Sequence, residues 1–186
     1  NAVWRGNAEY TPTTVTPNMK YFDDSDTDCR YDVDKAKELL KEAGVKNLKL
    51  KLICAENINR LNAATIIQDM LKEVGITIEI QSYESGTFYE MVDAGETELF
   101  LVGFGAVGFP EPDNNIYGPF HSNQIPTNNM GFYEDPELDA MLDAQRATSD
   151  GPEREALVKD NQKYLRENVP VIPLANTQQV LGIRSD

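Results

Sequence analysis

Apolar positions recur at helical spacing in two stretches of the first half of the chain. Each stretch is followed by a run in which apolar and polar residues alternate strictly. Asp32 can cap the first helix, and Gly44 stands where a left-handed cap would close it. A second helix is predicted from about residue 59 to Gly75. The alternating runs 48–52 and 76–80 that come next are typical of strands.

The unit of helix, glycine and strand recurs a third time in shorter form. Phe88, Met91 and Val92 precede Gly95, and the apolar run 99–102 follows. Strands that alternate with helices of this length predict an α/β lobe with a mostly parallel sheet flanked by helices. Two further helices are predicted, each beginning near a proline, at 136–142 and 152–165. Two short strands are predicted beyond them, at 171–174 and 180–183.

The segment 103–134 shows neither the helical spacing nor the strand alternation of apolar residues, and it is rich in Gly, Pro and Asn. A structureless stretch of this length inside a compact domain is often functional. Open α/β sheets bind ligands at the carboxyl ends of their strands, and the third predicted end, 103–106, runs into this segment. Its aromatic and amide side chains suit a cleft for a small polar ligand. The alternative, in which the aromatics only pin the loop to the domain, stays open.

Composition narrows the classes of partner. Among 186 residues, 31 are acidic and 17 basic, and the formal net charge is −14. Such a surface repels the phosphates of nucleic acid and opposes binding to an anionic membrane. No apolar run approaches the ~20 residues that a membrane span needs. The chain opens at Asn1 on an irregular stretch rich in Pro and Thr, 10–17, which suggests a fragment of a longer protein.

Residues that could support catalysis or bind metal are few. His121 is the single histidine, without a second His or a Cys near it, so neither a metal site nor a Ser–His or Cys–His system is predicted. The acidic run 23–28 lacks the central Gly and closing Glu of a calcium loop and is interpreted as solvated. Glu111 and Asp113 form a carboxylate pair of unspecified separation. No cofactor motif is present, and no chemical step is expected.

The two cysteines, Cys29 and Cys54, fit no metal-binding spacing. Cys54 ends a strand pattern and is expected to be a small buried hydrophobe. A disulfide between them would require an oxidising compartment, and spacing alone leaves it open.

Segment 31–44, with the sequence YDVDKAKELLKEAG, closely resembles the helix that opens the second lobe of family 5 solute-binding proteins. These are the oligopeptide, dipeptide and nickel receptors of ABC transporters. Segment 68–76 is similar to the second helix–strand junction of the family, and 103–106 with 112–114 is similar to its glycine–aromatic loop. Further matches follow in the same order at 129–132, 135–139, Arg154 and 169–173.

The resemblance, which spans roughly 31–174, implies a two-lobed receptor that closes on its ligand and delivers it to a membrane permease. The resemblance thus implies a binding protein rather than an enzyme, located in the periplasm or tethered by lipid to the outer cell surface. The chain would be its C-terminal ligand-binding lobe over 31–186, with 1–30 as an irregular lead-in from the preceding lobe. The N-terminal lobe of the same protein would be its partner in binding.

The same resemblance indicates which residues contact the ligand. Those expected to line the cleft are Phe104, Gly105, Ala106 and Val107, with Tyr83, Asp113, Asn114 and Asn115 as further candidates. Peptide-binding members commonly offer an Asp to the peptide's α-amino group where Val107 stands here. Either Glu111 or Asp113 replaces it, or the ligand lacks an ordinary free amine. An oligopeptide or dipeptide is therefore expected, with an oligosaccharide, a nickel chelate or an opine as alternatives.

Two functions of other classes are alternatives to ligand capture. One is a hydrolase of glycosides or peptides that uses Glu111 or Asp113. The other is an interaction domain that recruits partners through its acidic face. Neither has a motif series comparable to that of the receptor family.

Overall fold

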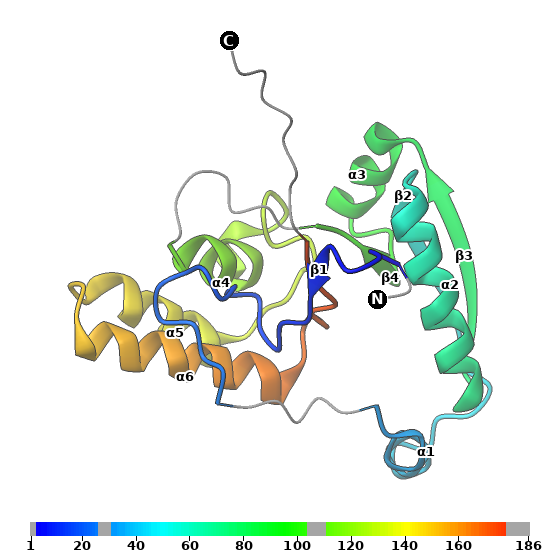
Figure 1. Cartoon of the computed structure of the whole chain (residues 1–186), viewed down its shortest axis with the longest axis horizontal. Helices are drawn as coiled ribbons and strands as arrows, with labels where there is room; N and C mark the ends of the chain where they lie inside the picture. The colour runs from blue at the N-terminus through cyan, green and yellow to red at the C-terminus, as the bar shows by residue number, and fades with distance from the viewer. Residues whose placement is uncertain (1–2, 26–30, 104–110, 178–186) are drawn as a thin grey trace.

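The computed structural model describes residues 3–25, 31–103 and 111–177, and these residues form two halves. The sheet half comprises 31–103, and the helical half combines 111–168 with 3–25. Figure 1 shows a short ribbon between them, in which β1 (Ala8–Glu9) pairs antiparallel with β5 (Asn176–Thr177). Among the described helices, none is both long and apolar enough to cross a membrane.

Three parallel strands form the sheet in the order β3–β2–β4, which confirms the predicted parallel arrangement. Strand β2 (Lys49–Ala55) lies in the centre, between β3 (Thr77–Tyr83) and β4 (Leu99–Leu101). In the register, Ala55 stands opposite Tyr83, and Cys54 stands opposite Leu101. The three carboxyl ends therefore lie at nearly the same level.

Two helices cover opposite faces of this sheet because neighbouring residues on β2 point to opposite sides. Leu52 packs with residues of α2 (Ile58–Glu73), whereas Ile53 packs with Phe88 of α3 (Ser85–Asp93). Helix α1 (Val33–Glu42) forms as predicted, and the Asp32 side chain accepts from the Lys35 backbone N–H at 2.8 Å. None of the residues of α1 is buried within the described part of the chain.

The helical half contains α4 (Asp113–Phe120), the 3₁₀ turn η1 (Ser122–Gln124), α5 (Pro136–Ala147) and α6 (Pro152–Asn168). Val15 and Met19 of the lead-in are buried in its core, against Ile116, Leu138, Leu142 and Val158. The lead-in therefore packs as part of this half, and the predicted boundary at residue 30 is not a boundary in packing.

Two predictions about irregular segments differ from the structure. The sequence predicts no regular structure over 103–134, yet this stretch contains α4 and η1. The strand predicted at 171–174 is absent, and pairing begins only at Asn176. Pro170 and Pro173 have no N–H to donate to a ladder, which explains why this apolar run does not pair. The strand predicted at 180–183 lies outside the described residues.

The acidic run 23–28 is not simply solvated, because its first residue, Asp23, is buried. Its carboxylate accepts from the Ser25 hydroxyl at 2.6 Å and from Arg166 Nη2 at 2.7 Å. Burial alone would raise the pKa of Asp23, but the hydrogen bonds from Ser25 and Arg166 outweigh it and lower that pKa. Residues 26–28 lie outside the described part.

Cys54 is buried on β2 with a free thiol, as expected of a small hydrophobe. Burial raises the pKa of this thiol, and the charge of Arg60 partly opposes that shift. Cys29 lies outside the described residues, so whether it pairs with Cys54 stays open.

Candidate functional site

The carboxyl edge of the sheet is where three strands end and two helices begin. Ala55 and Tyr83 end β2 and β3, and the Glu56 N–H donates to the Tyr83 carbonyl at 2.8 Å. Helix α2 starts after Asn57, whose side chain caps it, and α3 starts after Glu84. Helix N-termini carry unpaired N–H groups and partial positive charge. The edge therefore offers the polar groups that a small ligand requires.

Tyr83 lies at this edge, as predicted. Its ring is half-buried against the cluster of Ile53, Phe88 and Val92, and its hydroxyl donates to Gln81 Oε1. Apolar packing of the ring and a hydrogen bond of the hydroxyl thus fix the position of this side chain.

The four residues predicted to line the cleft, Phe104, Gly105, Ala106 and Val107, lie outside the described residues. Gly103, the last described residue before them, stands two positions beyond the end of β4. Their role in binding stays a prediction.

Arg60 was not among the predicted site residues, yet it lies at the same edge. It is half-buried in the first turn of α2, and its Nη2 would be 3.6 Å from a Cβ built on Gly103. One signal in the sequence could have found it. A cation three residues after a helix cap that follows a strand must stand at the carboxyl edge of a parallel sheet.

The other predicted residues lie on α4, in the helical half. Asp113 Oδ1 accepts from Gln145 Nε2 at 2.6 Å, and its Oδ2 pairs with Arg146 at 3.2 Å. Asn115 is buried, and its amide donates to the Thr14 carbonyl. Both side chains are therefore engaged in contacts that fix α4 to its neighbours.

Asn114 is exposed and borders a small polar hollow of about 200 Å³. The Arg146 guanidinium lies over the Tyr117 ring there, 3.7 Å from its centroid. The structure thus brings Asp113 and Asn114 together at this hollow, while Tyr83 belongs to the sheet edge. The residues that line the hollow are Asp113, Asn114, Tyr117, Gly118, Gln124, Asn128 and Arg146.

Glu111 is engaged as well. Its carboxylate accepts from Arg154 Nη2 at 2.6 Å, in a partly buried pair. Burial opposes the charge of Arg154, but the bond to Glu111 outweighs it, and the pKa of Arg154 is raised. Glu111 and Asp113 therefore each neutralise an arginine. Using either as a general acid, a general base or an amine ligand would require breaking an existing ion pair.

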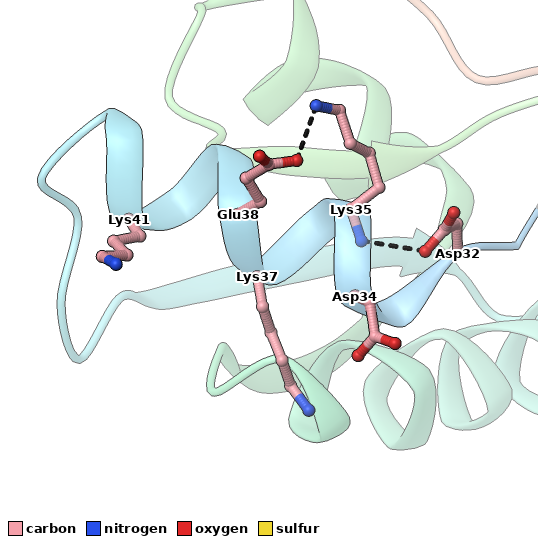
Figure 2. A pocket seen from close by; sticks show the side chains of 6 residues that line it. All are labelled: Asp32, Asp34, Lys35, Lys37, Glu38 and Lys41. Atoms are coloured by element: carbon pink, nitrogen blue, oxygen red, sulfur yellow. Dashed lines mark hydrogen bonds and ion pairs between the residues drawn. The ribbon is translucent and has the colours of Figure 1, made fainter.

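A larger hollow, of about 580 Å³, lies along α1 and is shown in Figure 2. Six charged residues of this one segment line it, and Lys35 bonds to Asp32 through its backbone and to Glu38 through its ammonium group. Helix α1 precedes β2, so the hollow lies toward the amino ends of the strands. Its lining residues are all charged, whereas ligand pockets are lined mostly by hydrophobic and aromatic side chains. We therefore assign the candidate site to the carboxyl edge.

Comparison with known proteins gives concordant matches in sequence. The profile described as bacterial extracellular solute-binding proteins, family 5 Middle, matches residues 1–127. The di/tripeptide-binding protein 3 of Pseudomonas aeruginosa is 31% identical over 184 residues, which cover 95% of this chain and 34% of that protein. The chain thus spans about a third of the length of this relative.

Solved structures agree in fold. A periplasmic binding protein associated with an ABC transporter of Helicobacter pylori, in complex with the peptide STSA, matches with a TM-score of 0.85 and 31% identity, over 94% of this chain and 34% of that one. A dipeptide-binding protein from a Pseudoalteromonas species, in complex with Met-Leu, matches with a TM-score of 0.86 and 26% identity, over 95% and 36%.

Proposed function

The chain belongs to the bacterial extracellular solute-binding proteins of family 5, and we propose that it is one lobe of a receptor that captures a short peptide for an ABC importer. The observation that carries the proposal is the match in fold and sequence, along nearly the whole chain, to the peptide-bound Helicobacter pylori protein. The name of the Pseudomonas aeruginosa relative, a di/tripeptide-binding protein, supports the same ligand class.

Capture rather than chemistry is the expected mechanism. Two lobes close on a ligand by a hinge motion, and each lobe supplies part of the contacts. This lobe would contribute the carboxyl edge of its sheet, where the starts of α2 and α3 present polar backbone groups. The N-terminal lobe of the same receptor would contribute the remainder, so this lobe alone should bind weakly. The loaded receptor would then deliver its ligand to the permease of the importer.

In this function Phe104, Gly105, Ala106 and Val107 line the cleft together with Tyr83, as the family resemblance implies. Asn114 is the exposed candidate on α4, while Asp113 and Asn115 act through their bonds to Gln145 and Thr14, which hold that helix. The receptor would work outside the cytoplasm, in the periplasm or tethered by lipid to the outer cell surface.

Titration calorimetry on the complete receptor tests the ligand class. The tetrapeptide STSA and the dipeptide Met-Leu should bind saturably, and a maltooligosaccharide and a nickel–histidine complex should not. Phe104→Ala should weaken peptide binding about tenfold or more, since an aromatic contact in a closed cleft is lost. Leu39→Ala, on exposed α1, is the matched control and should leave affinity unchanged. Binding of the oligosaccharide or the chelate but of neither peptide would overturn the proposal.

One observation favours a second candidate ligand. Val107 stands where peptide-binding relatives commonly offer a carboxylate, and both nearby carboxylates, Glu111 and Asp113, are paired with arginines. A buried ammonium group without a carboxylate partner is costly to desolvate. A ligand without a free amine, such as an N-acylated peptide or an opine, would avoid that cost. N-acetylated Met-Leu binding more tightly than Met-Leu itself would establish this alternative.

A further inference from the structure

Glu111 and Arg154 form an ion pair close in sequence to the four residues predicted to line the cleft, 104–107 (the cleft residues). Glu111 is the first described residue after them, and its Oε1 lies 2.6 Å from Arg154 Nη2. The Arg154 side chain is 13% exposed. Breaking an ion pair that is withdrawn from water costs more free energy than breaking an exposed one. On the same helix, α6, Lys159 and Glu155 form an exposed pair, 2.7 Å apart, which provides a matched comparison.

Arg154 is itself held by two further segments of the chain. Its Nε donates to the backbone carbonyl of Gln145 at 3.2 Å, and its Nη2 also donates to Gln145 Oε1 at 3.3 Å. Its Nη1 lies 3.6 Å from Asp150 Oδ1, in the turn between α5 and α6. The donors of a guanidinium lie in one rigid plane, so these contacts fix its orientation. Arg154 is therefore a fixed partner that holds the Glu111 carboxylate in one place.

Helix α4, which follows Glu111, is held by contacts of its own. The helix begins at Asp113, whose carboxylate accepts from Gln145 Nε2 at 2.6 Å. Asn115 bonds to the lead-in, and Ile116 is fully buried in the core of the helical half. The pair of Glu111 with Arg154 therefore constrains the chain before α4, on the side from which it arrives from the cleft residues.

The sheet fixes the other end of this stretch. Strand β4 pairs with β2 as far as Leu101, which stands opposite Cys54. The chain between Leu101 and Glu111 thus joins the sheet half to the helical half, and each end is held by a different half. When both ends of a segment are fixed, less conformational entropy remains to be lost on binding a ligand. Fixing Glu111 therefore lowers the free-energy cost of ligand binding.

We propose that Arg154 is a positioning residue for ligand capture. Through Glu111 it fixes the chain that leads from the cleft residues into α4, and ligand affinity depends on it although it does not contact the ligand. This inference rests on the proposed function and makes it more specific. It gives a partly buried ion pair of the helical half an effect on binding at the carboxyl edge of the sheet half. The alternative, in which the pair only stabilises the helical half, predicts lower stability with unchanged affinity.

Titration calorimetry on the complete receptor with STSA tests the positioning role. Arg154→Met should weaken binding about threefold to tenfold, because more conformational entropy must then be lost in the binding step. Glu111→Gln, which removes the charge and keeps the shape, should also weaken binding. Arg154→Lys should keep part of the wild-type affinity. Lys159→Met, which breaks the exposed pair with Glu155, is the matched control and should leave affinity unchanged.

A double-mutant cycle with Phe104→Ala separates positioning from stability. If Arg154 acts by positioning the cleft residues, Phe104 has already lost part of its contribution in Arg154→Met. The combined variant should therefore bind STSA at least about threefold more tightly than the product of the two separate losses predicts. A merely structural role gives the product itself, and that result would overturn the proposal.

The outcomes also separate this inference from the proposed function. Each variant is measured well below its own thermal midpoint, so that loss of folded protein does not imitate loss of affinity. If Arg154→Met and Glu111→Gln bind STSA as tightly as the wild type, the positioning role is wrong and peptide capture stands. If the wild type binds neither STSA nor Met-Leu, peptide capture fails and the positioning role fails with it. If Arg154→Met does not fold, the same cycle on Glu111→Gln decides.

Discussion

The two halves of the lobe are stabilised in different ways. The core of the sheet half is built from apolar side chains at regular spacing, such as Ile53, Phe88 and Val92. The helical half also has an apolar core, but it buries polar side chains beside it, among them Gln145 and Gln162. The difference shows that local periodicity is enough to specify the first half. The second depends on contacts between segments that are distant in the sequence.

Gln162 illustrates the second kind of contact. Its Nε2 donates to the Tyr21 carbonyl at 2.8 Å, and its Oε1 accepts from the Asp23 N–H and the Thr13 hydroxyl, each at 3.1 Å. One side chain of α6 thereby holds the irregular lead-in at several points. The lead-in has no regular secondary structure over these residues, so side chains of this type supply the partners for its backbone.

The largest effect is expected in the sheet half, where Phe88 is fully buried between β2 and α3. Phe88→Ala should lower the free energy of unfolding by about 3–5 kcal/mol, since it removes apolar contacts and leaves a cavity. Its neighbour Tyr89 is 37% exposed, and Tyr89→Ala should cost under about 1.5 kcal/mol. Urea denaturation measures both. Equal losses would contradict the assignment of Phe88 to this core.

In the helical half, Arg166→Met tests the buried ion pair with Asp23. Removing one partner leaves the other charge buried and should cost about 3 kcal/mol. Lys163 on the same helix is exposed and 3.8 Å from Glu167, so Lys163→Met should change stability by less than about 0.5 kcal/mol. The comparison is made by urea denaturation at neutral pH. A loss as small as that of the control would mean that the lead-in is not held through Asp23.

The contact between the halves should have a smaller effect. Gly95, after α3, has φ +69° and lies against the Phe132 ring, 3.2 Å from where a Cβ would stand. Gly44 has φ +68° with open space around it. Gly44→Ala should cost about 1 kcal/mol from backbone strain alone, whereas Gly95→Ala should cost about 2–3 kcal/mol because Phe132 must also shift. If thermal unfolding gives equal losses, the two halves do not meet at Phe132.

The smallest effect concerns pH. Asp135 caps α5 and accepts from the hydroxyls of Tyr164 at 2.8 Å and Tyr133 at 2.9 Å. The bond from Tyr164 is the main cause that lowers the pKa of Asp135, and the same bond raises the pKa of Tyr164 to about 12. A carboxyl group with a lowered folded-state pKa stabilises the fold above its unfolded pKa, and this stability is lost as pH falls through the folded value.

We therefore expect Tyr164→Phe to lose less stability than the wild type between neutral pH and pH 3. Tyr164 is half-buried against the core of the helical half, and the substitution removes only its hydroxyl. Denaturant midpoints at both pH values provide the measurement. An unchanged or steeper dependence on pH in Tyr164→Phe would show that the hydroxyl does not stabilise the ionised form of Asp135.

Much of the fold could be predicted because alternation and helical spacing are local properties. The strands around Leu52 and Ile78, and the caps at Asp32 and Gly75, follow from a few neighbouring residues each. Helix α4 could not be predicted this way, since its eight residues include Gly118 and Pro119. Its buried residues, such as Ile116, are covered by Val15 of the lead-in, a contact that no local pattern indicates.

The candidate site likewise has one part that local sequence patterns predict and another part that they do not. The place of Tyr83 could be predicted, because parallel strands bring their carboxyl ends to one edge. The contacts of Asp113 and Glu111 could not, because their partners Gln145 and Arg154 lie 32 and 43 residues away in the sequence. Both carboxylates, which are candidates for ligand contact, are parts of ion pairs.

Hydrogen exchange on the complete receptor, with and without saturating STSA, tests most directly whether the carboxyl edge is the ligand face. Amides at 55–60 and 83–86 should exchange at least about tenfold more slowly with the peptide bound, because closure removes them from water. Amides at 43–49, which connect α1 to the amino end of β2, should exchange at an unchanged rate. Protection at 43–49 without protection at 55–60 and 83–86 would contradict the account.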